Sequence, residues 1–429
     1  MRRRHFLFAT GSALSASRIL GANDRVHVGL IGCGGRGRYV AGFMRQVPNV
    51  HFSAVCDVWR EKRLAAKQWA GPDTAEFSDF RKLLEHKPLD AVLVATPDHW
   101  HAIPTIFACQ AGKDVYVEKP LAHNVREGRA MVEAARRYKR IVQVGTQHRS
   151  APHYAEVAQI VQSGGIGEVR FVRVWNYSNM LPNGIGHADD EAVPDGVDWD
   201  MYLGPAPMVP YNRLRIGPTY RWFWDYAGGT ITDFGVHRFD TVNQVMNAKA
   251  PLTVSATGGR YVLKDDGQMP DLLQVTWEFP GWVLSYEACN FNSHGTGGRT
   301  PGMKYYHAKG ADDRPHGEAY YGTKGTLMCD RLGYEIYPGS EGVQRVYKNS
   351  TDATALHARN FIECVRSRKR PNADVELGHW GTNIAHLGNI AYKTRRKLVW
   401  DSVKEDFEGA AEASALLSRK ARKPWDIIG

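Results

Sequence analysis

The sequence predicts an α/β protein of two domains, the first a doubly wound parallel sheet and the second an α+β domain. Three observations lead to this prediction. The chain has 429 residues, which is too long for one hydrophobic core. Apolar strand-like segments alternate with helix-like segments up to residue 145, as in a parallel sheet with crossover helices. From residue 169 the pattern changes to longer strands rich in Val, Tyr and Trp.

The composition is that of a globular protein, with 43% hydrophobic and 23% charged residues. The net charge of +10 is compatible with nucleic-acid binding, but Lys and Arg are scattered along the chain, so we expect a solvated basic surface and no nucleic-acid partner. Beyond the N-terminus no apolar run reaches the about 18 residues of a membrane span. The six cysteines are widely spaced and form no CxxC pair, so we expect buried small side chains and no metal site.

Residues 1–22 predict an export signal of the twin-arginine (Tat) type. An arginine pair lies just before Phe-Leu in Arg2-Arg3-Arg4-His5-Phe6-Leu7, and a weakly apolar run rich in Ala and Ser follows. We therefore expect cleavage near Leu20-Gly21-Ala22 and a periplasmic mature protein. The alternative is an ordinary basic N-terminus.

The first strand of the parallel sheet ends in a glycine-rich turn. The apolar segment Arg25–Ile31 runs into Gly32-Cys33-Gly34-Gly35-Arg36-Gly37, the pattern G-x-G-x-x-G, and a helical segment from Tyr39 to Gln46 follows. In such a turn the first glycine permits the tight bend, the second lets a pyrophosphate approach, and the third allows the helix to pack on the strand. The helix N-terminus then offers free N–H groups to the phosphates. This pattern predicts a dinucleotide-binding Rossmann domain.

A carboxylate at the end of the second strand indicates which dinucleotide is bound. The strand Phe52–Cys56 ends at Asp57, 20 residues after Gly37. An acidic residue at this spacing accepts hydrogen bonds from the adenosine ribose hydroxyls and repels a 2′-phosphate. We therefore expect NAD rather than NADP, although Arg60 nearby would weaken that preference.

Two further strands end in polar loops. The strand Asp90–Ala95 continues into Thr96-Pro97-Asp98-His99-Trp100-His101, and the strand Asp114–Val117 continues into Glu118-Lys119-Pro120. In doubly wound sheets the ligand lies beyond the carboxyl ends of the strands, which is where both loops fall.

These motifs, in this order and at this spacing, resemble the glucose–fructose oxidoreductase / inositol dehydrogenase / rhizopine-catabolism (Gfo/Idh/MocA) family. The resemblance covers essentially the whole chain after the leader. It implies a Rossmann domain over residues 23–148, a substrate domain over 149–400 with an open, mainly antiparallel sheet, and a C-terminal tail over 401–429. It also implies a cis Lys119-Pro120 peptide, with the lysine directed at the nicotinamide and the substrate hydroxyl. The expected cofactor contacts are Gly32, Gly34, Arg36, Gly37, Asp57, Thr96, Pro97, His101, Glu118 and Lys119.

The family resemblance further implies an Asp and a His four residues apart on a helix of the second domain. Asp233 and His237 fit this spacing, which places both on one helix face. With Lys119 they form the expected catalytic group. A histidine suits removal of a hydroxyl proton, and a lysine ammonium stabilises a developing alkoxide. The alternative is a helix-capping Asp233 and a core His237, and the Lys119-Pro120 motif favours the catalytic interpretation.

Substrate contacts are less well defined. The aromatic run Tyr220–Tyr226 suits the C–H faces of a sugar ring but equally suits a hydrophobic core. Its members Trp222, Trp224 and Asp225, together with Arg149, are the weaker candidates. Asp98 stands where the family commonly has Asn, so its role is open. The resemblance also implies a homo-oligomer, a dimer or tetramer, formed through the second-domain sheet.

Export would place the protein where no pool of free NAD exists, so we expect a tightly retained cofactor and a cycle that restores its redox state. The favoured function is an NAD(P)-dependent oxidoreductase acting on a secondary hydroxyl of a sugar, polyol or glycoside. The alternative is an NAD-dependent glycoside hydrolase that oxidises, eliminates and reduces again. A non-catalytic dinucleotide sensor is a second alternative, against which the presence of Lys119, Asp233 and His237 argues.

Overall fold

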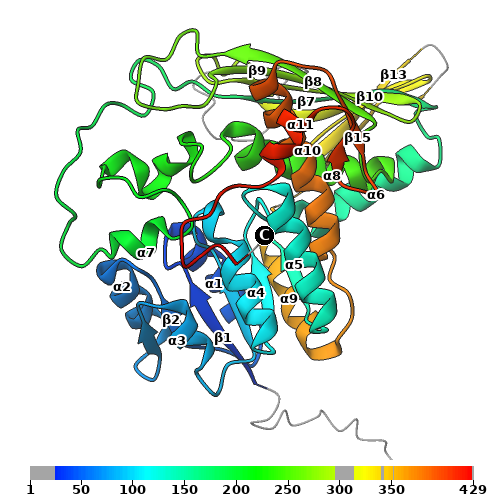
Figure 1. The fold of residues 1–429 in the computed structure, drawn as a ribbon. Coiled ribbons are helices and arrows are strands. Elements are labelled where there is room, and N and C mark those ends of the chain that lie inside the picture. The colour runs from blue at the N-terminus through cyan, green and yellow to red at the C-terminus, as the bar shows by residue number, and fades with distance from the viewer. Residues whose placement is uncertain (1–24, 295–313, 340–342, 351, 428–429) are drawn as a thin grey trace, which may run out of the picture.

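The computed structural model describes residues 25–294, 314–339, 343–350 and 352–427, arranged as two layered domains that lie against each other (Figure 1). The candidate leader over residues 1–22 lies outside the described residues. Within the described ranges, no helix has both the length and the apolar character needed to cross a membrane. The same ranges contain no group of three His, Cys, Asp or Glu side chains placed to hold a metal ion.

The first domain contains the predicted doubly wound sheet. Its strands are all parallel and follow the order β3-β2-β1-β4-β5-β6. The chain builds the sheet outward from β1 to β3 on one side and then from β4 to β6 on the other. Every residue of β4 is buried, as expected for an apolar strand covered by helices on both faces. The strands are β1 Val26–Ile31, β2 Val50–Cys56, β3 Ala75–Phe77, β4 Ala91–Val94, β5 Asp114–Val117 and β6 Val142–Val144. The helices are α1 Gly35–Arg45, α2 Arg60–Ala70, α3 Phe80–Leu84, α4 Ala102–Gln110 and α5 Val125–Arg137.

The second domain is built on an open sheet whose order, among the described strands, is β14-β13-β12-β11-β7-β10-β9-β8-β15-β16. It is mainly antiparallel, as predicted, but β7 and β10 pair in parallel at its centre. The pairing is parallel because the chain leaves the sheet after β7 and re-enters it three strands away, at β8. The strands are β7 Val169–Tyr177, β8 Thr253–Gly259, β9 Leu272–Phe279, β10 Trp282–Cys289, β11 His316–Gly322, β12 Gly325–Asp330, β13 Gly333–Pro338, β14 Val346–Asn349, β15 Leu398–Asp401 and β16 Asp406–Phe407.

Helices cover one face of this sheet and join it to the first domain. The helices are α6 Pro152–Gln162, α8 Val236–Met246, α9 Thr354–Ser367, α10 Val375–Thr394 and the short α11 Ala411–Ser414. The core between α8 and the sheet is aromatic: the Phe239 ring meets Trp277 and Tyr286 edge-on, with centroids 5.2 Å apart in both pairs. Helix α9 instead packs its buried Phe361 and Ile362 into the core around α1.

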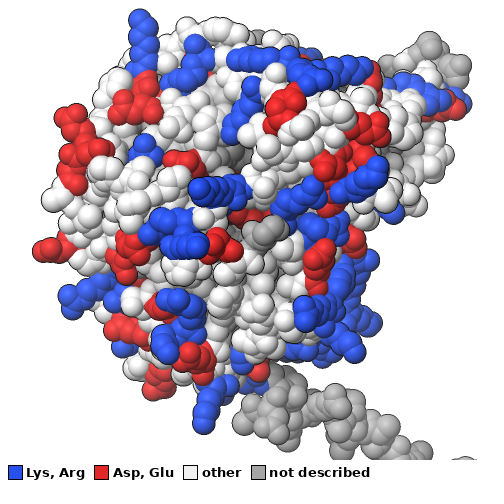
Figure 2. All heavy atoms as spheres, in the orientation of Figure 1, with Lys and Arg blue, Asp and Glu red and all other residues white. Residues whose placement is uncertain are grey.

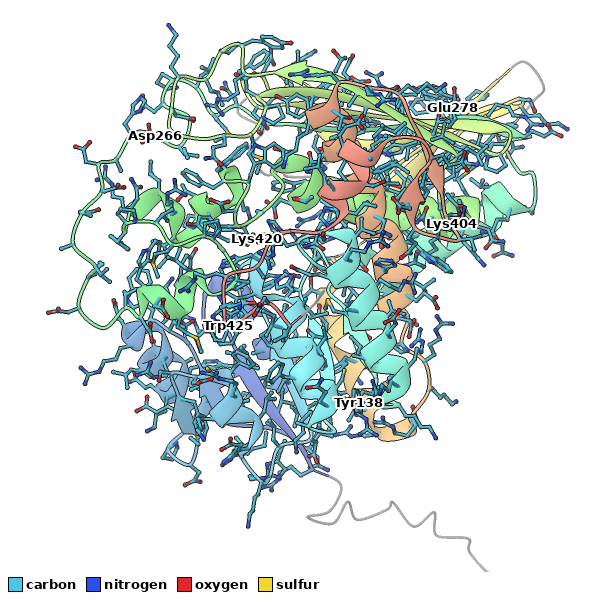
Figure 3. The ribbon with its side chains drawn as sticks, viewed as in Figure 1. Tyr138, Asp266, Glu278, Lys404, Lys420 and Trp425 are labelled. Carbon is cyan, nitrogen blue, oxygen red and sulfur yellow. The ribbon has the colours of Figure 1, made fainter. Side chains whose placement is uncertain are left out.

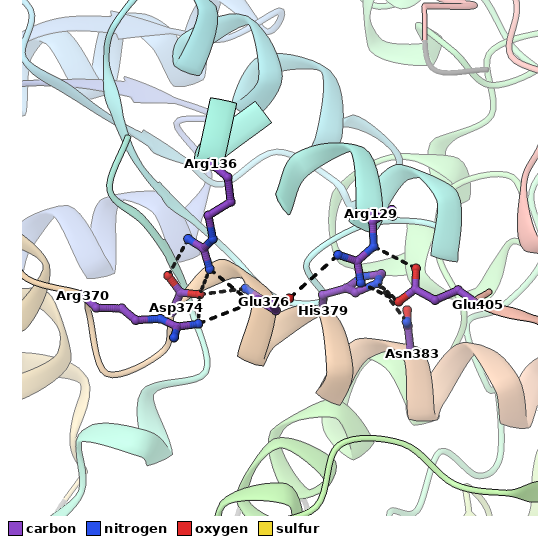
Figure 4. Close-up of polar contacts among 8 residues, drawn as sticks. All are labelled: Arg129, Arg136, Arg370, Asp374, Glu376, His379, Asn383 and Glu405. Carbon is purple, nitrogen blue, oxygen red and sulfur yellow. Dashed lines mark hydrogen bonds and ion pairs between the residues drawn. The ribbon is translucent and has the colours of Figure 1, made fainter. Parts of the chain in front are cut away.

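A polar network holds α5 of the first domain to α10 of the second (Figure 4). Arg136 pairs with the buried carboxylate of Asp374 at the start of α10, and Arg129 donates to Glu405 at 2.7 Å. His379 Nε2 donates to the same Glu405 carboxylate at 2.8 Å. Burial holds the pKa of His379 below its usual range, so at neutral pH this contact is a hydrogen bond from a neutral ring. The network fixes the orientation of one domain on the other.

A long excursion between β7 and α8, residues 178–228, returns to the first domain; we call it the covering arm. It includes α7 Trp199–Leu203 and the short helices Arg213–Arg215 and Gly217–Trp222. Figure 1 shows it in green beside α2. Trp199 stacks on Tyr202 at 5.0 Å, within a hydrophobic cluster made largely of the arm's own side chains. Three backbone hydrogen bonds between described residues attach it to the first domain. Arg60 N donates to the Gly196 carbonyl (2.8 Å), Asp198 N to the Val58 carbonyl (3.0 Å) and His99 N to the Tyr226 carbonyl (3.2 Å). The arm therefore has a small core of its own.

The C-terminal tail crosses from the second domain back onto the first, where Figure 3 labels Trp425. The Trp425 ring meets Trp100 edge-on at 4.8 Å and lies 6.3 Å from Phe80. Arg81 lies over its other face at 5.0 Å. Residues 418–427 thus complete the hydrophobic core of the first domain on the side of α3 and α4.

Candidate active site

A cavity of about 620 Å³ opens at the carboxyl ends of β1, β2, β4 and β5. This is the edge of the sheet at which the sequence placed a ligand. The covering arm closes the other side, through residues that include Tyr202, Tyr220 and Arg221. Of the predicted cofactor and catalytic residues, the cavity walls contain Gly32, Gly34, Arg36, Asp57, Thr96, Pro97, His101, Glu118, Lys119, Asp233 and His237.

The glycine-rich turn has the geometry that dinucleotide binding requires. Gly32 has φ +93°, and a Cβ there would lie 2.6 Å from the Ala95 carbonyl group. A Cβ on Gly37 would lie 2.2 Å from the Gly32 carbonyl oxygen, so this glycine packs the helix on the strand. Around Gly34, by contrast, no described atom lies within 4 Å of where a Cβ would stand, which leaves room for a pyrophosphate. Helix α1 begins at Gly35 rather than at the predicted Tyr39, because packing at Gly37 outweighs the low helix propensity of glycine.

Two buried polar atoms of the cavity wall match a bound dinucleotide. Arg36 Nη2 and Thr96 Oγ1 are buried and find no hydrogen-bond partner within the described part of the chain. Arg36 Nε donates to the Glu118 carboxylate at 2.8 Å, which fixes the guanidinium beside the turn. Buried polar groups in proteins are normally satisfied, so both atoms fit a ligand that supplies phosphate oxygens or an amide. The residues present therefore fit the cofactor that the turn predicts.

Asp57 is held in place by backbone donors. Its carboxylate accepts hydrogen bonds from Cys33 N at 2.7 Å and from Trp59 N at 2.8 Å. Burial raises the pKa of Asp57, and these hydrogen bonds oppose the rise. Lys62 lies 4.1 Å above the Trp59 ring, and both side chains line the cavity. Lys62 is thus a cation that lines this end of the cavity, whereas Arg63 donates to the Asp57 carbonyl at 2.9 Å and Arg60 packs against Gly196 of the covering arm.

Lys119 joins the two domains inside the cavity. The Lys119-Pro120 peptide is cis, as the family resemblance implied. Lys119 Nζ donates to the Asp233 carbonyl at 2.7 Å and also to the Asp233 carboxylate. Arg221 Nε lies 3.1 Å from the same carboxylate oxygen. Burial opposes ionisation of Asp233, but the two cations hold its pKa well below its usual range. Asp233 is therefore a carboxylate at neutral pH.

His237 lies one helical turn beyond Asp233. Asp233 belongs to a π-helical turn, Ile231–Gly235, that leads into α8, and His237 is in the first turn of α8. Such turns are rare and often occur at functional sites. Burial, then Lys119 and Arg36, lower the pKa of His237 well below its usual range, so its imidazole is neutral at neutral pH. The His148 ring lies behind it, with centroids 5.1 Å apart.

The other residues of the Thr96–His101 loop have structural partners. His101 Nδ1 lies 2.7 Å from the Pro120 carbonyl oxygen and Nε2 lies 2.9 Å from that of Thr96, so the ring braces this loop against the Lys119-Pro120 peptide. The buried Asp98, whose role the sequence left open, accepts a hydrogen bond from the Tyr220 hydroxyl at 2.8 Å. Asp98 therefore anchors the covering arm at Tyr220, the residue next to Arg221.

The structure separates the weaker substrate candidates from the cavity. Tyr220 and Arg221 of the aromatic run line it, whereas Trp222 does not, and Trp224 and Asp225 line a second cavity of about 340 Å³. The run forms a short helix, Gly217–Trp222, and this turn selects which side chains face inward. The sequence missed Lys62, Gln147, Arg221 and Arg331 as cavity residues. Arg221 lay within the quoted run, but Arg331 follows β12 and carried no local signal.

Arg149 is buried with Asp240 instead of lining the cavity. Its guanidinium contacts the Asp240 carboxylate at 2.8 and 2.9 Å, and the Asp240 side chain is fully buried. We expect Arg149→Met to lower the free energy of unfolding by about 3–5 kcal/mol, because the buried carboxylate loses its partner. Urea unfolding followed by circular dichroism measures this loss. Arg170→Met, which breaks the exposed Arg170–Glu168 pair, is the control and should change stability by under about 1 kcal/mol. Equal losses in both variants would contradict the assignment of Arg149 as a structural residue.

Comparison with known families agrees with this geometry. Residues 26–146 match the family model described as "Oxidoreductase family, NAD-binding Rossmann fold". Residues 153–261 and 336–427 match the model described as "Oxidoreductase family, C-terminal alpha/beta domain". The chain belongs to the Gfo/Idh/MocA oxidoreductase family. The family membership confirms the resemblance drawn from the Gly32–Gly37 turn, Lys119-Pro120 and the Asp233/His237 spacing.

Relatives of this Gfo/Idh/MocA protein include inositol dehydrogenases. Myo-inositol 2-dehydrogenase of Thermotoga maritima is 24% identical over 88% of this chain and 99% of its own length. Inositol 2-dehydrogenase of Rubrobacter xylanophilus is 32% identical, but the match covers 38% of this chain and 48% of the relative. The match to an uncharacterized oxidoreductase of Bacillus subtilis, YrbE, likewise spans about half of that protein.

Solved structures share the fold at low sequence identity. An aldose-aldose oxidoreductase from Caulobacter crescentus superposes with a TM-score of 0.65 at 17% identity, covering 87% of this chain and 99% of that chain. A levoglucosan dehydrogenase in complex with NADH and levoglucosan gives 0.65 at 18% identity, with the same coverage.

Proposed function

We propose that this protein is an NAD(P)-dependent oxidoreductase that acts on a secondary hydroxyl of a sugar, polyol or glycoside. One observation carries the proposal: Lys119, Asp233 and His237 meet on the wall of the same cavity as the glycine-rich turn and Asp57. The turn and Asp57 would hold a dinucleotide, which would supply a hydride acceptor to the cavity that the three side chains line. The family relatives named for inositol and levoglucosan support a polyol or sugar as the substrate.

The charges of the site suit removal of a hydroxyl proton. When bound, the nicotinamide accepts the hydride that leaves the substrate carbon. His237 is neutral, so its imidazole can take the hydroxyl proton, and Lys119 Nζ can donate a hydrogen bond to the oxygen as negative charge develops there. Asp233 holds Lys119 in place, and Arg221 keeps Asp233 ionised. A hydroxyl must therefore bind between Lys119 and His237.

A panel of sugars, polyols and aryl glycosides tests the function. With added NAD, or with a sugar acceptor that reoxidises bound cofactor, we expect NADH fluorescence or a reduced acceptor together with a keto product. Release of the aglycone without net NADH would replace this proposal by the redox-neutral glycosidase. Absence of any turnover across the panel, in protein shown to hold dinucleotide, would favour a sensor.

We further propose that the cofactor is retained through the cycle, in a protein exported by the Tat pathway. The covering arm supports retention, because its own hydrophobic cluster closes the cavity and residues such as Tyr202 line the cofactor space. Release of the dinucleotide then requires the covering arm to move away from the first domain. Denaturing the purified protein should free about one dinucleotide per chain into the supernatant. An empty protein that binds NAD only weakly would contradict retention.

The choice between NAD and NADP is predicted to depend on Asp57. We expect Asp57→Asn to raise the affinity for NADP relative to NAD by at least about tenfold, since a 2′-phosphate no longer meets a like charge at short range. Lys62 then offers that phosphate a cation. Titration of dinucleotide-free protein, followed by tryptophan fluorescence, gives both affinities. Asp73→Asn, at an exposed position, is the control. An unchanged ratio in Asp57→Asn would remove Asp57 from cofactor selection.

A further inference from the structure

The second cavity, of about 340 Å³, lies where four parts of the chain meet. Its walls come from residues 123–124, which follow the Lys119-Pro120 peptide, from residues 205–207 and 224–228 of the covering arm, from α10 and from the C-terminal tail. The arm segment Trp224–Gly228 that lines it runs directly into the turn carrying Asp233. Of the residues named above for cofactor or substrate, only the weaker candidates Trp224 and Asp225 line this cavity, and none of those that line the first cavity does.

Two buried amides belong to the walls of this cavity, and each has one polar atom without a hydrogen-bond partner among the described residues. Asn124 and Asn389 are both 6% exposed. Asn124 Oδ1 accepts from Glu127 N at 2.9 Å and caps α5, so its other atom is a donor, Nδ2, which has no partner. Asn389 Nδ2 donates to the Gly228 carbonyl at 2.9 Å, so its other atom is an acceptor, Oδ1, also without a partner. Their backbone partners thus fix which way each amide points.

His123 and Arg419 each provide one further buried polar atom without a hydrogen-bond partner among the described residues. His123 Nε2 donates to the Trp224 carbonyl at 2.9 Å, and burial holds the pKa of His123 well below its usual range. In the neutral ring the buried Nδ1, which has no partner, is therefore a second acceptor. Arg419 uses Nε for Glu127 (2.7 Å) and Nη2 for the His99 carbonyl (2.6 Å), which leaves Nη1 as a second donor. The walls thus offer both donors and acceptors.

The charge around the cavity is positive. Its lining includes Lys393, Arg419 and Lys420 against a single carboxylate, Asp225. Lys393 Nζ lies 3.8 Å above the Trp224 ring, and no ion pair joins Lys393 or Lys420 to a described carboxylate. Figure 3 labels Lys420 on the tail between the two domains, and Figure 2 shows basic side chains gathered across the middle of this face. An anionic group placed here would meet the ammonium groups of Lys393 and Lys420, with Asp225 as the opposite charge that acts on Lys393.

We propose that this cavity binds a polyhydroxylated organic anion: a sugar derivative that carries one carboxylate or phosphate. The anionic group is held by Lys393 and Lys420, and the hydroxyls donate to Asn389 Oδ1 and His123 Nδ1. Asn124 Nδ2 and Arg419 Nη1 donate to the ligand's oxygens. A neutral sugar would leave the lysines unmatched, and a bare inorganic anion would leave both acceptors without donors. The site is independent of the reaction proposed for the first cavity.

Isothermal titration calorimetry of the full-length protein with its cofactor tests the proposal. We expect gluconate or glucose 6-phosphate to bind at least about tenfold more tightly than glucose, acetate or inorganic phosphate, as hydrogen bonds to charged groups predict. Whether gluconate or glucose 6-phosphate binds identifies the anionic group. Equal binding of glucose or of inorganic phosphate, or no binding of either sugar anion, would overturn the proposal.

Matched variants locate the binding. Lys393→Met should weaken it by at least about tenfold, since the methionine keeps contact with Trp224 but loses the charge. Lys249→Met is the control, because Lys249 lies 5.1 Å above the ring of Trp380 and outside this cavity. Lys119→Ala should bind the anion as the parent protein does. Loss of binding in Lys119→Ala would place the ligand in the first cavity and refute the second site, whatever the panel of alcohols shows about the reaction.

Discussion

Replacing Lys119 with alanine should lower the rate of hydride transfer by about 10²- to 10⁴-fold, the range for removing a positioned group that stabilises developing charge. Lys119 Nζ is bonded to the Asp233 carboxylate at the end of the cavity next to His237, so its loss removes the donor expected to face the substrate oxygen. Single-turnover kinetics of NADH formation, with the best substrate of the panel, measure the effect. Lys119→Arg keeps the charge and should retain part of the rate.

The same variant should alter the pH dependence of the site. A depressed folded-state pKa contributes stability above the unfolded value and loses it as the pH falls through the folded value. In the parent protein the pKa of Asp233 is far below the working range, despite burial, because of Lys119 and Arg221. Without Lys119 that pKa rises, so we expect the acid limb of residual activity and of thermal stability to move to higher pH. Added ethylamine should partly restore the rate. Activity within about threefold of the parent enzyme, which lies far outside the range for a positioned catalytic group, would show that Lys119 takes no part in the chemistry.

Replacing Trp199 with alanine should free the cofactor. Trp199 stacks on Tyr202, which lines the first cavity, and its Nε1 donates to the Val209 carbonyl at 2.8 Å. Removal of a buried Trp leaves a void costing about 3–5 kcal/mol, here within the small core of the covering arm. We expect dinucleotide to stay with the parent protein during gel filtration and to separate from the variant.

Trp400→Ala provides the matched comparison. Trp400 is 5% exposed and Trp199 is 7% exposed, but Trp400 packs against Phe407 in the second domain. Both variants should lose similar stability, and only Trp199→Ala should release the dinucleotide. If both release it, or neither does, the covering arm has no specific part in retention.

Much of the fold could be predicted from local patterns. The change of pattern at residue 169 coincides with the first residue of β7, and the longer strands expected after it are found as β8, β9 and β10. The parallel pairing of β7 with β10 could not be read from either strand, because it depends on where the chain re-enters the sheet. Likewise, the low helix propensity of glycine argues against a helix that starts at Gly35. Helix α1 starts there because Gly37 packs closely against Gly32.

The candidate site also has a part that local patterns predict and a part that they do not. Motifs fixed by close chemistry, such as the Gly32–Gly37 turn and Lys119-Pro120, were found where the sequence placed them, around one cavity. Composition failed in the aromatic run, since a Trp serves a core and a sugar site equally well and only the local turn decides which side chains face inward. Arg331 reaches the cavity from a hairpin distant in sequence, and such a contact exists only after the sheet has formed.

The packing of Trp425 against Trp100 and Phe80 bears on the order in which this chain acquires its structure during synthesis. Helix α9 fills the side of the nucleotide-binding domain around α1, and Trp425 fills the side around α3 and α4. A ribosome delivers α9 only after strands β7 to β14 of the second domain, and Trp425 only after α10, β15 and β16 as well. The first 150 residues therefore remain incompletely packed, with apolar surface exposed, until α9 and the segment around Trp425 have been synthesised. We expect the first domain to complete its core, and to capture nucleotide, only after that point.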